Sequence, residues 1–479
     1  MNKQMTYYII GRVLKILALM LLLPILVAII YREDTVFSFA LPLLLSFTLG
    51  SILSHKKPEY TKFYIRDGFI TVGLVWIVLG IIGCFPFLIS GEIKEPINAL
   101  YETISGFTTT GSTLIKDVES LSKSILFWRS FTQWFGGMGI LVFMLAFMPQ
   151  DEGGSTMHIM KGETPGPMVG KLVPHIRKTA LILYAIYFMM TIAHVVALLF
   201  AGLPLFDALC ISFGSAGTGG LSIYNDSMAS MTPLALNITA SFMMLFGVNF
   251  TIYYLLLIKR FKEALKNEEF RFYGLIISIA FLFVGLNSLH LFTNVSLALT
   301  HSFFQITSII TTTGYTSVEI SSWTSLSKTI FLLLMFVGSC AGSTGGGFKI
   351  SRVLILIKGV MNEVVHFTHP RQVKMVKIND KVIDSQLLQA VNMYFAIYTG
   401  FFVLSLLIIS LENFDIVSNI SAVLSSLSNI GTDLITAGNT HPLTEYSILS
   451  KCILMIDMLA GRLEFVPILL LFHPKSWRK

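Results

Sequence analysis

Four short turns of the chain end on glycine and hold mainly small or neutral residues. They are Thr108-Thr109-Thr110-Gly111, Ala216-Gly217-Thr218-Gly219, Thr311-Thr312-Thr313-Gly314 and Ser428-Asn429-Ile430-Gly431. Glycine allows backbone angles that point successive carbonyls at one axis, and threonine adds a hydroxyl oxygen on a stiff, branched side chain. Rings of backbone carbonyls at membrane depth strip and hold dehydrated K+. Four such turns around one axis therefore predict a potassium pathway.

The chemistry of the turns favours a monovalent ion. No Asp or Glu precedes the glycine in any of the four turns. Neutral dipoles suit weakly hydrated K+ better than Mg2+ or Ca2+, whose protein sites prefer carboxylates. A loop that only joins two helices would explain one such turn, but it explains four turns at equivalent places poorly. The fourth turn lacks threonine, so the symmetry of the side chains is broken while its glycine remains.

The composition indicates a membrane protein. The chain has 479 residues, of which 54% are hydrophobic and only 13% charged, and its mean hydropathy is +0.74. Soluble proteins carry about 25% charged residues. The first apolar run, Ile16 to Ile30, follows basic residues but has no small-residue cleavage site, so we interpret it as a retained helix rather than a signal peptide.

The order of the apolar segments predicts an all-α integral membrane protein, with two N-terminal helices and four helix–pore-loop–helix units around one central pore. The expected divisions are 1–66 for the two-helix segment and 67–177, 178–271, 272–384 and 385–479 for the four units, the last with a cytoplasmic tail. The half-helices are expected near 96–106, 205–213, 297–309 and 415–427, and the second spans of the units near 124–147, 234–257, 327–357 and 447–472. Divergent internal repeats are a known way to build a transport protein around a central site.

Lysine and arginine are distributed unevenly along each unit. They gather between units, as in the stretches 259–271 and 371–381, and are nearly absent after the turns of units two and four. Unit one is an exception, with Lys116, Lys123 and Arg129 after its turn. The positive-inside rule places the inter-unit loops and both termini in the cytoplasm and the turns toward the outside.

A polar, glycine-rich stretch interrupts the second span of unit three. The ten residues 338–347 include five glycines, each of which destabilises a helix by about 1 kcal/mol relative to Ala. Because unpaired backbone groups are costly in lipid, the stretch should face the pore interior just below the ring, where it could occlude the path and withdraw. A break for tight packing is the alternative. The phosphate-loop pattern G-x-x-x-x-G-K-[ST] is not met, because Phe348 precedes Lys349.

Four charged residues fall within or near the last apolar run: Lys451, Asp457, Arg462 and Glu464. Charges at membrane depth are costly and usually face an interior or a cavity. Arg462 could set a positive barrier below the ring, or it could form an internal ion pair with Asp457 or Glu464. Both interpretations stay open, since a paired arginine can still line a pore.

The chain resembles the Trk/Ktr/HKT superfamily of potassium transporters over essentially its whole length. The most specific matches are Phe107-Thr108-Thr109-Thr110-Gly111, Gln133-Trp134-Phe135-Gly136-Gly137-Met138-Gly139-Ile140, Gly342-Ser343-Thr344-Gly345-Gly346-Gly347 and Gly461-Arg462-Leu463-Glu464. The extra pair of N-terminal spans favours the bacterial Trk branch over the Ktr branch. The resemblance implies potassium uptake across the bacterial cytoplasmic (inner) membrane, with K+ as the transported ion and no organic cofactor in this chain.

The resemblance also implies roles for individual residues. K+ would bind the carbonyls just before the filter glycines, which are those of Thr109, Thr110, Gly217, Thr218, Thr312, Thr313, Asn429 and Ile430. The filter glycines would be Gly111, Gly219, Gly314 and Gly431. The gating loop matches residues 338–349 and includes Gly342, Ser343, Thr344, Gly345, Gly346, Gly347 and Lys349, and the pore arginine matches Arg462. The second turn is unusually rich in glycine, so that quarter of the filter could be looser and less selective for K+ over Na+.

The expected partners also come from the resemblance. Family members form homodimers in the lipid bilayer and sit on cytosolic TrkA-like nucleotide-binding regulatory subunits. Since this chain has no glycine-rich dinucleotide fold of its own, nucleotide control would come from such a partner. The basic stretches 259–271 and 371–381 are plausible docking surfaces, although the positive-inside rule already explains them. No dense basic and aromatic run suggests nucleic acid.

Two other classes of function are less consistent with the sequence. A sodium-coupled carrier of a small solute predicts two related repeats with broken helices, and the count of four turns argues against it. A membrane enzyme needs clustered ligands or nucleophiles, whereas His366 and His369 lie in a basic loop without a cysteine beside them, so we expect no enzyme. The cysteines form no C-x-x-C motif and are expected to pack as small hydrophobes: Cys84, Cys210, Cys340 and Cys452.

Overall fold

The computed structural model describes residues 2–58, 64–139, 176–369, 375–379, 381–431 and 442–477, and it confirms the predicted all-α membrane fold. The chain begins with an antiparallel helix pair, α1 (Lys3–Tyr31) and α2 (Val36–Leu53). These two helices cross at Gly11 and Gly50, where a Cβ on Gly50 would lie 2.8 Å from the carbonyl oxygen of Gly11. Small residues permit this close approach, which gives helices in lipid their packing contacts. The hydroxyls of Thr6 and Thr71, 3.0 Å apart, join the pair to the rest of the protein.

The remaining helices follow one order four times: a long helix, a half-helix, a turn and a further helix, which is broken in the second, third and fourth series. The first series is α3 (Ile65–Gly83), α4 (Phe85–Ser90), α5 (Pro96–Phe107) and α6 (Lys123–Gly137). The second is α9 (Ile176–Phe200), α10 (Leu205–Gly217), α11 (Pro233–Phe246), α12 (Phe250–Leu257) and α13 (Phe261–Lys266). The third is α14 (Glu268–Ser288), α15 (Val295–Ile310), η1 (Ile320–Ser322), α16 (Ser325–Val337) and α17 (Ile350–Thr368). The fourth is α18 (Ser385–Ile409), η2 (Ser410–Glu412), α19 (Ile416–Ser428), η3 (Pro442–Thr444), α20 (Ile448–Arg462), α21 (Val466–Phe472) and η4 (Pro474–Trp477).

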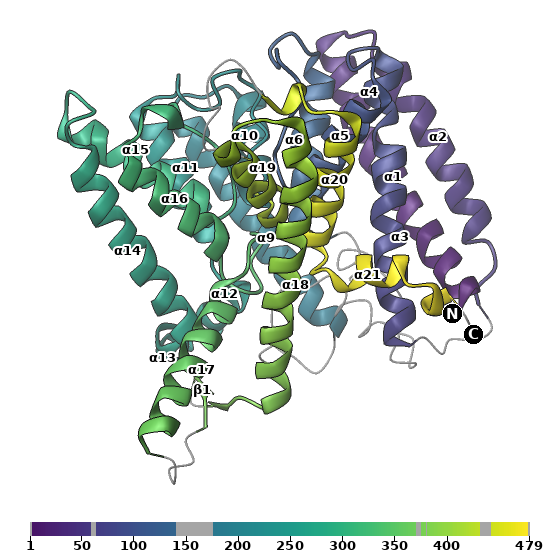
Figure 1. Cartoon of the computed structure of the whole chain (residues 1–479). Coiled ribbons are helices and arrows are strands. Elements are labelled where there is room, and N and C mark those ends of the chain that lie inside the picture. The colour runs from purple at the N-terminus through teal and green to yellow at the C-terminus, as the bar shows by residue number, and fades with distance from the viewer. Residues whose placement is uncertain are drawn as a thin grey trace.

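A short hairpin joins the third and fourth series. Strand β1 (Lys377–Ile378) pairs antiparallel with β2 (Lys381–Val382), with Lys377 opposite Val382. The hairpin is docked on the start of α14, because the backbone N–H of Glu268 donates to Asn379 Oδ1 at 2.8 Å. In Figure 1 the hairpin, α13 and both chain termini lie in the lower part of the molecule, whereas the half-helices lie in the upper part.

The second span of a unit is not one continuous helix, which corrects the continuous runs expected over 234–257 and 447–472. The axes of α11 and α12 differ by 90° at a break of three residues, and α20 and α21 are separated at residues 463–465. Glycines mark these breaks: a Cβ on Gly461 would overlap the carbonyl oxygen of Leu427, and one on Gly247 would lie 2.7 Å from Thr311 Cγ2. The helices therefore stop where they pass the end of a half-helix. Of the described helices, six are long and apolar enough to cross a membrane, or seven if the α11–α12 pair is one bent span.

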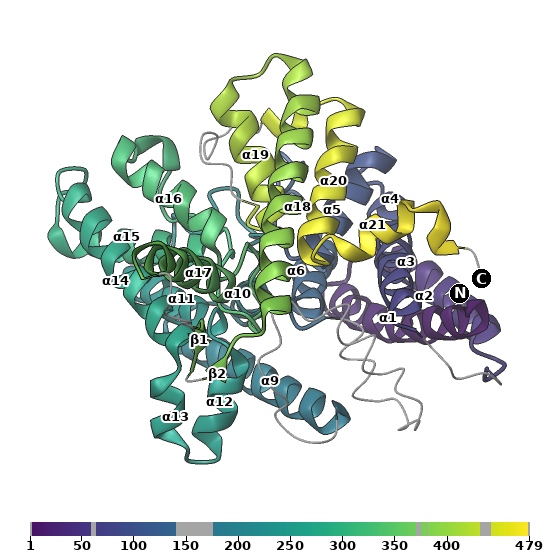
Figure 2. The same cartoon turned by 60° about the horizontal axis from the view of Figure 1, so that its bottom comes forward.

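The four series close into a ring. Helix α6 of the first packs on half-helix α10 of the second, α11 on α15, α16 on α19, and α20 of the fourth returns to α5 of the first. Figure 2 shows α19, α10 and α5 gathered around the middle of the molecule, with α1 and α2 at one side. Each half-helix is therefore held by a helix from the preceding series, and the order of the chain is also the order around the ring.

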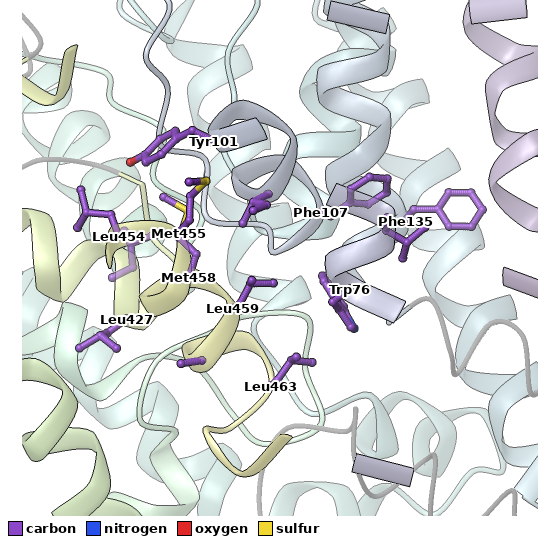
Figure 3. Close-up of a cluster of buried hydrophobic side chains, with 14 of the residues drawn as sticks. Trp76, Tyr101, Phe107, Phe135, Leu427, Leu454, Met455, Met458, Leu459 and Leu463 are labelled. Carbon is purple, nitrogen blue, oxygen red and sulfur yellow. The ribbon is translucent and has the colours of Figure 1, made fainter. Parts of the chain in front are cut away.

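Buried apolar side chains seal the point where the ring closes. Leu454, Met455 and Met458 of α20 lie beside Tyr101 of α5, and Leu459 and Leu463 continue the same cluster (Figure 3). Such packing contacts, rather than removal of apolar surface from water, drive the association of helices in a membrane. This cluster holds the first and last units together although they lie more than 300 residues apart in the sequence.

Candidate functional site

The four predicted turns have the same backbone conformation. Each half-helix ends one or two residues before a residue in the left-handed region, and these residues are Thr109, Thr218, Thr312 and Asn429, with φ of 55°, 55°, 57° and 54°. The next backbone N–H donates to a carbonyl five residues earlier, from Thr110 to Ser105 at 2.9 Å and from Ile430 to Ser425 at 2.9 Å. A glycine with positive φ follows in every turn, so the four segments are structural repeats.

The register predicted for the second turn is wrong by one residue. Its glycine with positive φ is Gly220 (φ 67°), which corresponds to Gly111, Gly314 and Gly431 (φ 81°, 87° and 75°). The N–H of Gly219 donates to the carbonyl of Gly214 at 2.8 Å, so Gly219 corresponds to Thr110 and not to Gly111. Three glycines within four residues, Gly217-Thr218-Gly219-Gly220, made this register ambiguous in the sequence.

The turns meet one another in the order of the chain. A Cβ on Gly111 would overlap the carbonyl oxygen of Gly219, one on Gly220 would overlap that of Thr313, and one on Gly431 would overlap that of Thr110. The amide of Asn429 also donates to the hydroxyl of Thr110 at 2.9 Å and to the carbonyl of Met458 at 2.9 Å. The structure thus brings all four predicted turns to one place, where only glycine fits beside the neighbouring carbonyl.

Backbone oxygens of the turns lack hydrogen-bond donors. Within the described residues, no donor reaches the carbonyls of Thr109, Thr110, Thr218, Gly219, Thr312, Thr313, Asn429 and Ile430, although all eight residues are buried. The carbonyl of Gly217 differs, since it accepts a hydrogen bond from the hydroxyl of Thr218 at 2.6 Å. Buried carbonyls are normally paired, and an unpaired one costs about 1–3 kcal/mol. A dehydrated cation at this place would interact favourably with the partial negative charges of these carbonyl oxygens.

The glycine-rich loop between α16 and α17 lies directly against two of the turns. The N–H of Gly346 donates to the hydroxyl of Thr312 at 2.6 Å. A Cβ on Gly346 would overlap the carbonyl oxygen of Ser428, and one on Gly345 would lie 2.7 Å from that of Thr311. The loop therefore fills the space between the third and fourth turns, and glycine is required there for close approach.

Hydrogen bonds within the third series, and one to the second series, hold the rest of this loop. The carboxylate of Glu269 accepts from the N–H of Ala341 at 2.6 Å, and the N–H of Cys340 donates to the carbonyl of Gly247 at 3.1 Å. Lys349 is buried with φ 82°, and its ammonium donates to the carbonyl of Gly345 within the loop. The hydroxyls of Ser339 and Ser343 lie 2.8 Å apart. This loop is an ordered segment with specific anchors.

Arg462 joins three units below the turns. Its guanidinium donates to the carbonyl of Thr344 in the loop at 2.9 Å, and to the carbonyls of Gly136 and Gly137 at the end of α6, the latter at 2.6 Å. Of its two expected acidic partners, Glu464 binds Arg352 at 2.6 Å and Asp457 accepts from the hydroxyl of Ser405 at 2.8 Å. A positive charge is therefore fixed under the turns by backbone carbonyls.

Comparison with known proteins agrees with this geometry. The family model for TrkH, described as a cation transport protein, matches residues 36–479. The chain belongs to the TrkH family. The Trk system potassium uptake protein TrkH of Salmonella typhimurium is 36% identical over 467 residues, which cover 96% of each chain. The Trk system potassium uptake protein TrkG of Escherichia coli K12 is 32% identical over 96% of each chain. The crystal structure of the potassium transporter TrkH from Vibrio parahaemolyticus superposes with a TM-score of 0.90 at 32% identity and covers both chains completely.

Membership of the TrkH family confirms the resemblance found in the sequence. It also confirms the predicted location, since the chain is a multi-pass protein of the bacterial cytoplasmic membrane. The relatives are named as transporters, in agreement with a function in transport rather than catalysis.

Sequence reasoning missed a buried ionic network behind the first turn of this TrkH-family chain. Arg129 was counted only as an exception in the charge asymmetry, yet it is 2% exposed and its Nε donates to Glu102 Oε1 at 2.7 Å. Glu102 also accepts from the hydroxyl of Thr113 at 3.0 Å. A glutamate inside an apolar half-helix was the signal that could have identified the pair, because such a charge needs a partner.

Proposed function

We propose that this chain takes up K+ across the cytoplasmic membrane through the ring of four turns. The observation that carries the proposal is the set of eight buried turn carbonyls that no described donor reaches. Neutral oxygen dipoles of this kind can replace the hydration shell of K+. The relatives are named as potassium uptake proteins, which supports K+ as the transported ion.

The K+ ligands in this proposal follow the register of the turns. They are the carbonyls of Thr109, Thr110, Thr218, Gly219, Thr312, Thr313, Asn429 and Ile430, and the filter glycines are Gly111, Gly220, Gly314 and Gly431. Gly217 leaves the predicted ligand set because its carbonyl already accepts a hydrogen bond from Thr218. The proposed units keep the divisions 67–177, 178–271, 272–384 and 385–479 after the segment 1–66.

The loop 338–349 is the proposed gate, with Gly342, Ser343, Thr344, Gly345, Gly346, Gly347 and Lys349 at its centre. Its contacts with the third and fourth turns support this role, because the loop would then lie in the way of an ion that leaves the ring. The charges of Lys349 and Arg462 add electrostatic repulsion below a cation filter. Movement of the loop away from Thr312 would open the path.

Regulation is proposed to come from partners. A homodimer of this chain would bind TrkA-like nucleotide-binding subunits on its cytoplasmic face, with the basic stretches 259–271 and 371–381 as docking surfaces. The hairpin β1–β2 supports a link to the gate, because it is bound to Glu268, the residue next to the loop anchor Glu269. A nucleotide-dependent movement of the hairpin would then reach the loop through the start of α14.

Uptake of 86Rb+ into proteoliposomes that contain only this purified chain tests the proposal. We expect uptake that excess K+ blocks and choline does not. A variant that lacks Gly345–Gly347 should show faster uptake, because the loop would no longer reach Thr312. No K+-sensitive uptake by either protein would overturn the proposed function, and competition by an organic solute with Na+ dependence would favour a sodium-coupled carrier.

A further inference from the structure

We infer that Arg129 and Gln133, one turn apart on α6, are positioning residues that fix the second turn and maintain its preference for K+ over Na+. This inference rests on the proposed function of the ring. The second turn contains the most glycine of the four, so its shape depends on what packs behind it. Helix α6 belongs to the preceding unit and packs on half-helix α10.

The second turn lacks a hydrogen bond that the first and third turns make internally. The hydroxyl of Ser105 donates to the carbonyl of Ser112 at 2.5 Å, and the hydroxyl of Ser308 donates to that of Tyr315 at 2.6 Å. The equivalent position in the second unit is Gly214, which has no side chain to donate. The peptide after the second turn, at Leu221, therefore has no such tie to its own half-helix.

Gln133 holds the same residue from the neighbouring unit, through the N–H of Leu221 rather than its carbonyl. Its side chain is fully buried, and its Oε1 accepts a hydrogen bond from the N–H of Leu221 at 3.2 Å. A Cβ on Gly219 would lie 2.5 Å from Gln133 Nε2, and one on Gly217 would overlap the carbonyl oxygen of Gln133. The extra glycines of this turn thus give α6 room to approach, so we expect the second quarter to be held in place rather than looser.

Arg129 holds the next residue of the same segment. Its Nη1 donates to the carbonyl of Ser222 at 3.1 Å, while its Nε donates to the carboxylate of Glu102 at 2.7 Å. Glu102 lies in half-helix α5, so one guanidinium connects the first half-helix to the second turn. The positions equivalent to Glu102 in the other units are Ile211, Gln305 and Ala422, and a charged pair at this position is thus specific to the first unit.

These two hydrogen bonds would let the second turn discriminate between K+ and Na+, which have the same charge but differ in size. The carbonyl of Gly219 lies against Gly111 and belongs to the proposed ligand set. If the Leu221 peptide is released, glycines on both sides of Thr218 can rearrange, because glycine resists rotation less than other residues. The carbonyls could then close on the smaller Na+. Loss of the tie should therefore change the ratio of Na+ to K+ affinity rather than abolish binding.

Gln133→Leu removes the hydrogen bond at nearly constant volume, and Gln305→Leu is its matched control. Gln305 is fully buried in half-helix α15, and among the described residues neither of its amide atoms has a hydrogen-bond partner. Arg129→Lys keeps a positive charge beside Glu102 but removes the donor to Ser222. Gln133→Leu should lower the K+/Na+ preference by about fivefold, the effect of one neutral hydrogen bond. Arg129→Lys should lower it by at least as much, because the donor to Ser222 is charged, whereas the control should keep the wild-type ratio.

The preference can be measured without transport. The thermal midpoint of the purified full chain is followed in detergent while K+ or Na+ replaces choline, since an ion that binds the folded state raises it. An unchanged K+/Na+ ratio in Gln133→Leu, or an equal change in Gln305→Leu, would overturn this inference but not the proposed function. Wild-type protein that K+ does not stabilise more than Na+ would overturn the proposed function, and this inference with it. A lower thermal midpoint with an unchanged ratio would show a merely structural role.

Discussion

The backbone N–H of Gly346 donates a hydrogen bond to the hydroxyl of Thr312 at 2.6 Å, so the glycine-rich loop is bonded directly to the third turn. The contact joins the proposed gate to the proposed filter through one side-chain oxygen. The carbonyl of Thr312 accepts no hydrogen bond from a described residue and is free to face an ion. One threonine thus serves both parts, its hydroxyl holding the loop and its carbonyl belonging to the ring.

Thr312→Val should raise basal 86Rb+ uptake by about fivefold, because valine keeps the shape of threonine but cannot accept the hydrogen bond of Gly346. Selectivity should stay as in the wild type, since the backbone carbonyl remains. Thr109→Val is the matched control: Thr109 occupies the same position in the first turn, and its hydroxyl has no partner among the described residues. An equal rise in basal 86Rb+ uptake in both variants would mean that loss of the loop contact is not the cause of the faster uptake.

Gly220→Ser and Gly314→Ser should both admit Na+, because a Cβ is strained at their positive φ of 67° and 87° and disturbs the adjoining carbonyls. Competition of Na+ with 86Rb+ uptake measures the effect. Gly202→Ser is the control, since Gly202 has φ 90° but nothing within 4 Å of its Cβ position. If Gly220→Ser kept wild-type selectivity, the register of the second turn would not describe the conducting ring.

Glu102→Gln should destabilise the protein by about 3–5 kcal/mol, because it leaves the buried guanidinium of Arg129 without its counter-charge. Unfolding of the detergent-solubilised chain by denaturant measures the change. Arg260→Gln is the comparison: it breaks an exposed pair with Glu263, whose side chains are 57% and 52% exposed, and should cost about 0–1 kcal/mol. Equal losses would mean that burial of the Glu102 pair does not matter for stability.

Acidification should weaken the contact between η2 and the start of α20. Glu412 accepts hydrogen bonds from the N–H of Ser447 at 3.0 Å and from the hydroxyls of Ser447 and Ser450. Protonation of this carboxylate would remove part of its capacity to accept these hydrogen bonds, so the stabilisation should be lost on acidification.

The thermal midpoint measured from pH 3 to pH 7 tests this expectation. Glu412→Gln should reduce the midpoint at pH 7 and flatten its fall on acidification, because the variant has no carboxylate to protonate. Glu363→Gln, at an exposed position of α17, serves as the control. A wild-type pH profile in Glu412→Gln would assign the acid sensitivity to other groups.

The half-helices were predictable because their signals are local. Segments expected near 96–106 and 415–427 appear as Pro96–Phe107 and Ile416–Ser428, where a proline or an aspartate starts the helix and a left-handed residue ends it. The second half-helix was the exception: it extends to Gly217 rather than 213, because Gly214 and Gly217 are accommodated in a helix packed against Gln133 and Tyr315. Glycine looked like a helix breaker there, but neighbouring units decided its role.

By itself the sequence determined the membrane class and located the four glycine-ended turns, the glycine-rich loop and the buried charge of Arg462, since these follow from hydropathy, backbone preference and spacing along the chain. Only the tertiary structure decided that Gly220 rather than Gly219 is the equivalent glycine, that Arg462 binds Thr344 and the end of α6, and that Gln133 holds the second turn. These features depend on contacts between units about 100 residues apart. Backbone preference is local and therefore readable from the residues, whereas the partner of a buried donor or carbonyl is set by packing between distant segments.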